Sequence, residues 1–285
     1  MSKRDNDIPI YTLPPGAGGG IMVMRQSFDG SPGSQQIERP HRDSGYTFIL
    51  QEKGVTHIEI DFQIYQLQSP AVIFIRPGQV HRVIAFEDAE ISTWMITAEN
   101  LRPDYLHLLN NLVLQNELSL AQESMNILSA TARVCMKVFE LKDQKLYHAF
   151  LQDGCNTLVG LVASQFAAQA NPTGNYTRFE LVTNAFRKSL EQNFKTIKRP
   201  AMYAELLNVS VSYLNECVHK TSGRPVSDLI RERVVLEAKR LLYHSAKSVK
   251  EIAGELGYDD YSYFTRLFVK AVGVTPLTFR DKNRD

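Results

Sequence analysis

The chain has 285 residues, 44% of them hydrophobic and 22% charged, which is the composition of an ordinary globular protein and a length that suggests two domains. Its three cysteines lack regular spacing, which argues against a disulfide framework or a zinc site, and no apolar run reaches the ~20 residues of a membrane span. The overall charge of +1 hides an asymmetry, because residues 176–285 carry 19 Lys/Arg and 13 Asp/Glu, a net of +6, whereas residues 1–175 carry 13 and 18, a net of −5.

Residues 1–20 contain three prolines and a glycine-rich run, and we expect them to form a flexible arm. The glycines lack the strand-to-helix context of a phosphate-binding loop. The first residues lead into no apolar segment, so we expect no signal peptide. Cys135, Cys155 and Cys217 lie in apolar helical contexts and are expected to be reduced core thiols, as in a cytoplasmic protein.

Short runs of β-branched and aromatic residues, separated by Gly, Pro, Asn or Asp, predict strands within residues 21–97. The runs are Ile21–Met24, Tyr46–Leu50, Val55–Ile60, Phe62–Leu67, Val72–Ile75 and Ile91–Ile96. Many short antiparallel strands predict a small barrel or a jelly roll, and a barrel of this size can hold one small ligand.

Residues 101–170 are predicted to be helical, with one helix or two short ones over Leu101–Leu114 and further helices over Leu120–Phe139 and Tyr147–Ala168. The apolar faces of the last two helices, which include Met125 and Phe150, must be buried against something. They pack either on the barrel or on a second copy of the chain, and we favour a dimer interface.

Residues 171–176 consist of turn residues at the point where the charge changes sign, and we interpret them as a linker. After a helix over Phe179–Phe194, a helix-turn-helix pattern occurs twice. The first copy has a helix over Val211–Thr221 that ends at Gly223. The second begins at Ser248, where the Ser248 and Glu251 side chains predict a capping box, and continues past Gly257 to a helix that ends at Gly273.

The helical pattern from Pro225 to His244 separates the two copies by ~30 Å, since each residue of a helix rises 1.5 Å. Successive major-groove faces of B-DNA lie ~34 Å apart on one side of the duplex. One chain can therefore read two adjacent groove segments. The positive charge of the C-terminal part also favours DNA as the partner, although a solvated basic face would explain the charge equally well.

The same residues carry a resemblance to a known family. The segments Lys239–Leu242, Val249–Ala253, Leu256–Tyr258, Tyr261–Phe264, Arg266–Phe268 and Gly273–Pro276 resemble the signature of AraC/XylS-type bacterial transcription regulators. The N-terminal part is similar to the cupin-type sensor that many members carry. The resemblance implies an α+β multidomain fold: a cupin-like effector domain over residues 21–100, dimerisation helices over 101–170 and a double helix-turn-helix DNA-binding domain over 177–285.

The resemblance also implies candidate residues for each function. The DNA-binding candidates lie on or next to the second helix of each copy: Ser210, Ser212, Asn215, Glu216, Lys220, Tyr261, Ser262, Thr265, Arg266 and Lys270. Arg266 matches guanine in a bidentate way, Asn215 matches adenine, Glu216 matches cytosine, and Ser210 and Lys220 are phosphate candidates. The effector candidates are aromatic and polar residues that line the barrel or form its plain core: His41, Tyr46, Phe48, Phe62, His81 and Trp94.

Enzymes of the cupin type often bind a metal through His and carboxylate side chains from two strands. Here only His41, Asp43 and His81 are available, with Glu52 of uncertain register, and the expected His-x-His pair is reduced to His-x-Asp. We therefore expect no metal, no cofactor and no catalysis, and interpret the two histidines as hydrogen-bonded residues at the mouth of a pocket.

Three functions remain in competition. The favoured one is a dimeric transcription regulator, such as an activator, that binds double-stranded DNA under the control of a small effector, for example a sugar or another small organic molecule. RNA polymerase is a further candidate partner, and no membrane is expected. The alternatives are a metal-dependent cupin enzyme fused to a helical domain, and a DNA-binding regulator without a ligand.

Overall fold

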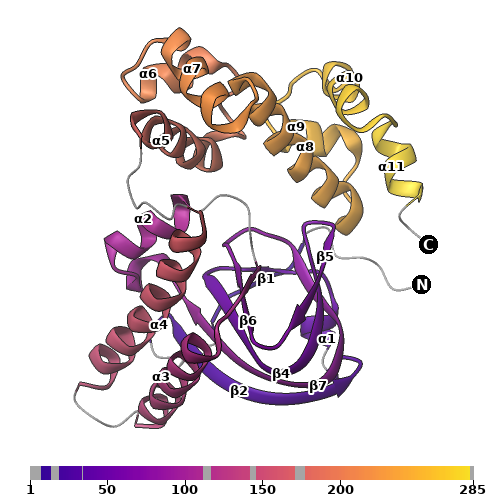
Figure 1. Cartoon of the computed structure of the whole chain (residues 1–285). Coiled ribbons are helices and arrows are strands. Elements are labelled where there is room, and N and C mark those ends of the chain that lie inside the picture. Colours follow the sequence, from indigo (N-terminus) through magenta and orange to yellow (C-terminus); the bar gives the residue numbers. More distant parts are fainter. Residues whose placement is uncertain are drawn as a thin grey trace. The chain divides into compact units, whose positions relative to one another are not determined.

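The computed structural model describes residues 8–13, 19–33, 35–111, 117–141, 146–170 and 177–282 (Figure 1). The chain divides into two compact units, one over Pro9–Gly174 and one over Asn175–Asp285 together with Met1–Ile8. The linker predicted at residues 171–176 lies outside the described residues. Within those described residues, every helix is too short or too polar to cross a membrane.

A curved antiparallel sheet forms the centre of the N-terminal unit. Its strands are β2 (Ile21–Gly30), β4 (Tyr46–Ile60), β5 (Gln63–Gln68), β6 (Ala71–Ile75), β7 (His81–Ile96) and β8 (Glu117–Ser119). They pair in the order β2-β7-β4-β6-β8, while β5 pairs with the second half of β4. A separate parallel pair joins β1 (Ile10–Tyr11) to β3 (Arg42–Asp43). The turn α1 (Gln35–Glu38) precedes β3.

The predicted arm is in part ordered. Residues 1–7 and 14–18 lie outside the described residues, but Ile10–Tyr11 form β1. The backbone N–H of Arg42 donates to the carbonyl of Pro9, and that of Ser44 donates to Tyr11. This stretch of the arm is therefore paired with the chain next to β4.

The prediction that Gly54 separates two strands was wrong, since β4 runs without a break through it. Gly54 has a φ of +66°, and a Cβ there would lie 2.2 Å from the carbonyl oxygens of Glu87 and Asp88. The register with β7 shifts on both sides of this position. Gly54 thus forms a β-bulge that bends the strand without ending it. The matching bend in β7 breaks its polar–apolar alternation, which explains why only Ile91–Ile96 was predicted as a strand.

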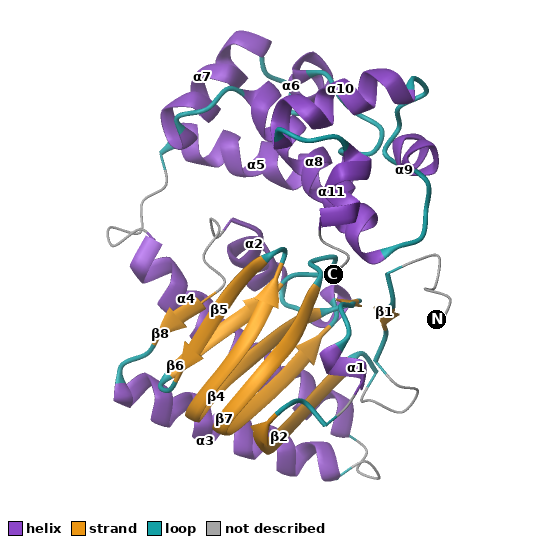
Figure 2. Cartoon of the chain, turned by 90° about the vertical axis from the view of Figure 1, so that its right-hand side faces the viewer, coloured by secondary structure: helices purple, strands orange, loops and turns teal. Residues whose placement is uncertain are grey.

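The two faces of the sheet carry different apolar clusters. One face, called the helix-covered face, contributes residues such as Phe48 and Trp94 to a core shared with the helices behind the sheet (Figure 2). The opposite, inner face carries Ile49, Ile58 and Ile73, among others. Alternate residues of a strand point to opposite faces, so neighbouring residues of β4 contribute to different cores.

The covering helices are α2 (Pro103–Asn111), α3 (Gln122–Glu140) and α4 (Tyr147–Ala170), and a short 3-10 turn, η1 (Ala98–Asn100), precedes them. Met125 and Leu128 of α3 and Leu151 of α4 are buried, as predicted. Phe150 is 50% exposed within one copy of the chain, so its burial against a second copy stays a prediction. One residue turns a helix by about 100°, so Phe150 and Leu151 lie on different sides of α4.

Where the structure describes the C-terminal unit, it is formed by α5 (Arg178–Asn193), α6 (Pro200–Leu206), α7 (Val211–Ser222), α8 (Val226–His244), α9 (Val249–Glu255), α10 (Tyr261–Val272) and α11 (Pro276–Lys282). The Ser248–Glu251 capping box predicted for α9 is confirmed. A second capping box, between Thr177 and Glu180, starts α5 and was not foreseen.

Gly257 follows α9 with a φ of +75°, in the left-handed region that favours glycine. A Cβ at this position would lie 2.0 Å from the carbonyl oxygen of Lys195. The close approach fixes α9 against the segment that follows α5. Gly254, three residues earlier, has open space around its Cβ position and lies within α9.

The substitution Gly257→Ala is expected to destabilise the C-terminal unit by on the order of 1–3 kcal/mol, through backbone strain and the clash with Lys195. Gly254→Ala is the matched control and should be neutral or stabilising by up to about 1 kcal/mol, because alanine favours a helix interior. Circular dichroism at 222 nm during thermal unfolding measures both. Fluorescence of Trp94, the only tryptophan, follows the N-terminal unit separately. Equal melting of the two variants would contradict the prediction.

Candidate nucleic-acid interface and effector site

Two copies of one local structure lie 50 residues apart in the C-terminal unit. The α7 helix begins at its N-cap Ser210, whose hydroxyl accepts from Tyr213, and α10 begins at Asp260, which accepts from Ser262 and Tyr263. Both helices end at a left-handed glycine, with φ of 68° at Gly223 and 83° at Gly273. Both helices therefore have 12 residues, a side chain as N-cap and a glycine as C-cap. Two residues that are 50 positions apart in the chain occupy equivalent positions on α7 and α10.

The outer face of α10 is polar and open. Ser262, Arg266 and Lys270 are exposed, and Tyr261 is 52% exposed, whereas Phe264 and Phe268 are fully buried on the other side. The Thr265 hydroxyl donates to the carbonyl of Tyr261 at 2.9 Å, which turns it toward its own helix. Among the described residues, the guanidinium of Arg266 has no hydrogen-bond or ion-pair partner and is available to an external one.

The outer face of α7 is more occupied than the sequence indicated. Glu216, which corresponds to Arg266, forms an ion pair of 2.6 Å with Lys220. The ammonium of Lys220 also lies 4.1 Å from the ring centroid of Phe179 on α5. Ser212 is exposed. The α7 copy thus presents a neutralised pair where the α10 copy presents a free cation.

Asn215 has structural partners on both sides of its carboxamide. Its Nδ2 donates to the carbonyl of Val211 at 3.0 Å, and its Oδ1 accepts from the backbone N–H of Val226 at 3.3 Å. The second bond ties α7 to the first turn of α8. Helical periodicity places Asn215 on the outer face, but only the fold shows that the start of α8 passes beside it.

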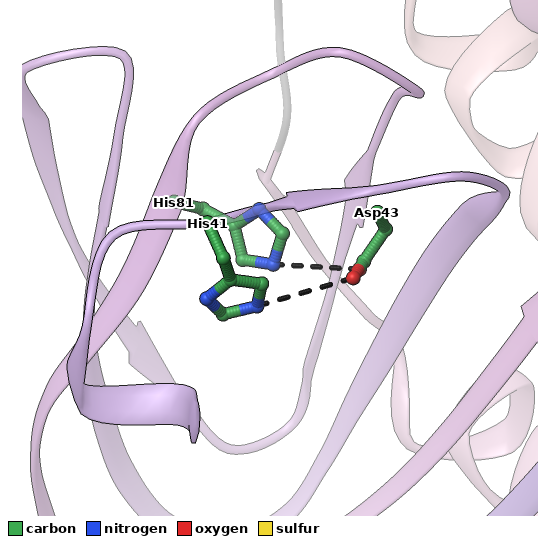
Figure 3. A group of neighbouring side chains, drawn as sticks. All are labelled: His41, Asp43 and His81. Carbon is green, nitrogen blue, oxygen red and sulfur yellow. Dashed lines mark ion pairs between the residues drawn. The ribbon is translucent and has the colours of Figure 1, made fainter. Parts of the chain in front are cut away.

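In the N-terminal unit, His41, Asp43 and His81 form a buried group on the inner face (Figure 3). The Nε2 atom of His81 lies 3.4 Å from Oδ2 of Asp43, and that of His41 lies 3.9 Å from Oδ1. His81 pairs in register with Ile60, a member of the inner cluster, and residues paired directly across two strands share a face. The group therefore lies at one end of the inner apolar cluster.

The protonation of this group is set by burial and by its own members. Burial, together with the neighbouring His81, lowers the pKa of His41 to about 4. Burial alone would raise the pKa of Asp43, but the hydrogen bond and charge of His81 and the Thr47 hydroxyl bond outweigh it and leave that pKa below its usual value. At neutral pH the group combines an ionised carboxylate with a neutral His41.

Two contacts of the group were not foreseen. The Thr47 hydroxyl donates to Oδ2 of Asp43 at 2.5 Å, and the ring of Tyr11 from β1 lies 4.6 Å from that of His41. Alternation along β4 offered a signal for Thr47, which shares the face of Ile49. No local sequence pattern predicts the contact of Tyr11 with His41, because the position of Tyr11 depends on the pairing of β1 with β3.

The remaining effector candidates lie elsewhere. Tyr46, Phe48 and Trp94 belong to the core between the sheet and the helices, with the rings of Phe48 and Trp94 stacked at 5.2 Å. Phe62 lies in the turn between β4 and β5 with a φ of 70°. The six candidates thus separate into three places: the core under the helices, the turn after β4, and the inner face, where His41 and His81 meet.

Glu52 is not near the His41 group. Its two carboxylate oxygens accept from the hydroxyls of Ser92 on β7 and Ser129 on α3, at 2.5 Å each. Arg25 on β2 lies 3.2 Å from the same carboxylate. This buried carboxylate thus connects three strands to α3 and is not available as a ligand for the group.

Comparison with known sequences identifies both units at the level of domains. Residues 32–152 match the AraC-like ligand binding domain, and residues 203–282 match a helix-turn-helix domain. Together the two profiles include the His41 group and all of α7 to α10.

Individual relatives match over shorter stretches. The HTH-type transcriptional activator RhaR of Cronobacter sakazakii (strain ATCC BAA-894) is 32% identical over 69 residues, which cover 24% of this chain and 24% of RhaR. RhaR of Enterobacter sp. (strain 638) is 28% identical over 119 residues, or 41% of each chain. The matches thus span less than half the length of these curated relatives. Among solved structures, ToxT from Vibrio cholerae O395 has 14% identity and a TM-score of 0.41, over 93% of this chain and 97% of its own.

Proposed function

We propose, from the premise that both domains of this chain are of AraC type, that the protein is a sequence-specific DNA-binding transcription regulator whose N-terminal unit binds a small effector. The observation that carries the proposal is the pair of equally capped helices, α7 and α10, with polar outer faces. A helix of this kind fits the major groove of B-DNA and reads base edges with the side chains it presents.

The helix between the two copies supports binding to two groove segments. The α8 helix has 19 residues, which corresponds to a length of about 28 Å. Within α8, Glu237 and Arg240 form a buried ion pair of 2.8 Å. The net charge of +6 over residues 176–285 attracts a polyanion and supplies affinity that does not depend on sequence.

The contacts of the described residues rank the reading positions. Arg266 is the leading base-reading residue, since its free guanidinium matches the O6 and N7 acceptors of guanine. Tyr261 and Ser262, which lie on the same helix as Arg266, are exposed and remain candidates. Ser212 is exposed on α7 and remains a candidate as well. Asn215, Glu216 and Thr265 must first exchange the partners they have within the protein, so we place them second.

The effector is proposed to bind at the inner face of the sheet, where the His41 group adjoins an apolar cluster. Such a site suits a small organic molecule with one polar end, for example a sugar. A thermal-shift screen against sugars and small aromatic acids is the direct test. We propose no catalytic function, because the relatives identified are transcription regulators.

A homodimer is proposed on the outer side of α3. Ile127, Val134 and Leu141 are 47%, 61% and 48% exposed and follow one another at intervals of seven residues. Residues seven apart lie on one face of a helix, and a partner helix can cover such a stripe. The relatives are named activators, which supports RNA polymerase as a further partner of the DNA-bound protein.

Selection of bound sequences from random DNA by the full chain tests the function directly. The expected result is enrichment of a site with two half-elements about 10 base pairs apart, one for each recognition helix. Enrichment of no sequence would contradict a sequence-specific regulator.

On the selected site, Arg266→Ala is expected to raise the Kd by about 5- to 150-fold, which corresponds to about 1–3 kcal/mol, and to relax the preference at one base position. Binding to random DNA should change much less. Arg102→Ala is the control for loss of one positive charge, since Arg102 lies in the N-terminal unit. Fluorescence anisotropy measures the affinity of the wild type and of both variants for each DNA. An equal loss on selected and random DNA would assign Arg266 to the phosphates instead.

Lys220→Ala should weaken binding to selected and random DNA alike and lower the slope of log K against log salt by about 1, as expected for one phosphate contact. An unchanged salt dependence would show that the ion pair with Glu216 keeps Lys220 from the phosphates.

The substitution Val134→Asp is expected to convert the dimer into a monomer, because it places a charge in the proposed apolar seam. Ile64→Asp is the matched control, since Ile64 is 65% exposed on β5, away from α3. Light scattering after size-exclusion chromatography measures the mass of each variant. A Val134→Asp protein that stays dimeric would place the interface elsewhere.

A further inference from the structure

The His41 group has an arrangement that DNA binding does not require. His41 immediately precedes β3, Asp43 ends it, and His81 starts β7. The backbone N–H of each histidine donates to the carbonyl of the other, both at 3.0 Å. This cross-strand pair fixes the two Cα positions, and the two imidazoles project from it to the same side, toward Asp43 (Figure 3).

The two rings are oriented through their Nδ1 atoms. Nδ1 of His41 donates to the carbonyl of Arg39 at 2.8 Å, and Nδ1 of His81 faces the carbonyl of Gln79 at 3.4 Å. In the structure Nε2 of His81 donates to the Asp43 carboxylate. An imidazole that donates through Nδ1 alone carries its lone pair on Nε2, so a metal ion that binds there replaces this proton. Both Nε2 atoms point at the Asp43 carboxylate. An imidazole held in this way by a backbone carbonyl is the usual arrangement of a metal-binding histidine.

The distances fit one metal ion. Ligand atoms at about 2.1 Å from a metal, at tetrahedral or octahedral angles, lie about 3.0–3.5 Å from one another. The distance from His81 Nε2 to Asp43 is 3.4 Å, and the distance from His41 Nε2 to Asp43 is 3.9 Å. The three ligand atoms, which lie within 4.8 Å of one another, therefore have to close in by up to roughly 1–2 Å to surround one ion.

We propose that His41, Asp43 and His81 form a binding site for one divalent transition-metal ion, with Nε2 of each histidine and the Asp43 carboxylate as its protein ligands. All three side chains are buried, at 5–6% exposure, and a cation balances the buried negative charge. The Thr47 hydroxyl holds the carboxylate from the side as an outer partner.

The ligand set also selects the class of metal. Two imidazoles and one carboxylate suit Zn²⁺, Fe²⁺, Co²⁺ or Ni²⁺, whereas Ca²⁺ and Mg²⁺ prefer oxygen ligands alone. Three protein ligands leave coordination positions open on the inner face. The site is independent of the proposed DNA binding, so either can fail without the other.

The test uses the full chain without an affinity tag, freed of metal with a chelator and then equilibrated with Co²⁺ or Zn²⁺. The expected result is one Co²⁺ per chain with a visible d–d absorption spectrum, displaced by Zn²⁺ in a competition titration. Elemental analysis after gel filtration measures the stoichiometry. Metal at background level in the wild-type protein would overturn the proposal.

Three variants locate the site. Asp43→Asn and His81→Gln keep the size and polarity of the side chains, and each should weaken Co²⁺ binding by at least about 100-fold, more than loss of an outer partner does. His57→Gln is the control, because His57 pairs with Glu87 at 2.7 Å away from the group and should bind Co²⁺ like the wild type. Trp94 fluorescence reports whether each variant is folded. If His81→Gln unfolds, the Co²⁺ affinity of Asp43→Asn alone tests the proposed ligands. Wild-type affinity in Asp43→Asn would overturn the assignment of ligands.

Discussion

Burial of the β4–β7 pair on both faces determines the rest of the N-terminal unit. Because side chains alternate along a strand, each residue of β4 belongs either to the core under α3 and α4 or to the inner face. Phe48 and Trp94 stack on the first side, while Thr47 and Ile49 lie on the second. The same alternation directs His81 inward, and its bridge to His41 brings it to Asp43, so the candidate metal ligands depend both on the β4–β7 register and on the position of β3.

In the C-terminal unit, α8 is the element on which the other helices depend, because it packs against helices of both copies. Its buried residues include the ion pair of Glu237 and Arg240, and the Arg280 guanidinium from α11 donates to the carbonyl of Leu242 near its end at 3.1 Å. Removal of one partner of the Glu237–Arg240 pair would leave a buried charge within α8, whereas the bond from Arg280 joins α11 to the end of α8. The two outer faces are thereby held on a common support, while the side chains proposed to read DNA remain outside the core.

The sequence carried much of this architecture because its signals were local. The capping box at Ser248, the glycine stops at Gly223 and Gly273 and the repeated helical periodicity each depend on residues within a few positions of one another. The strands were harder to predict. At Gly54 the bend depends on the carbonyls of Glu87 and Asp88, and β8 pairs with a strand more than forty residues away, so neither has a local pattern.

By itself the sequence thus determined the fold class and the two capped helices α7 and α10, because helix faces follow from spacing along the chain, and the family resemblance suggested Arg266 as the leading candidate for base reading. The tertiary structure decided the partners of Asn215 and Lys220, the side of the sheet to which Phe48 and Trp94 belong, and the meeting of Tyr11, His41, Asp43 and His81. These depend on strand register and on segments far apart in the sequence, and a shift of one residue in register would exchange the two faces.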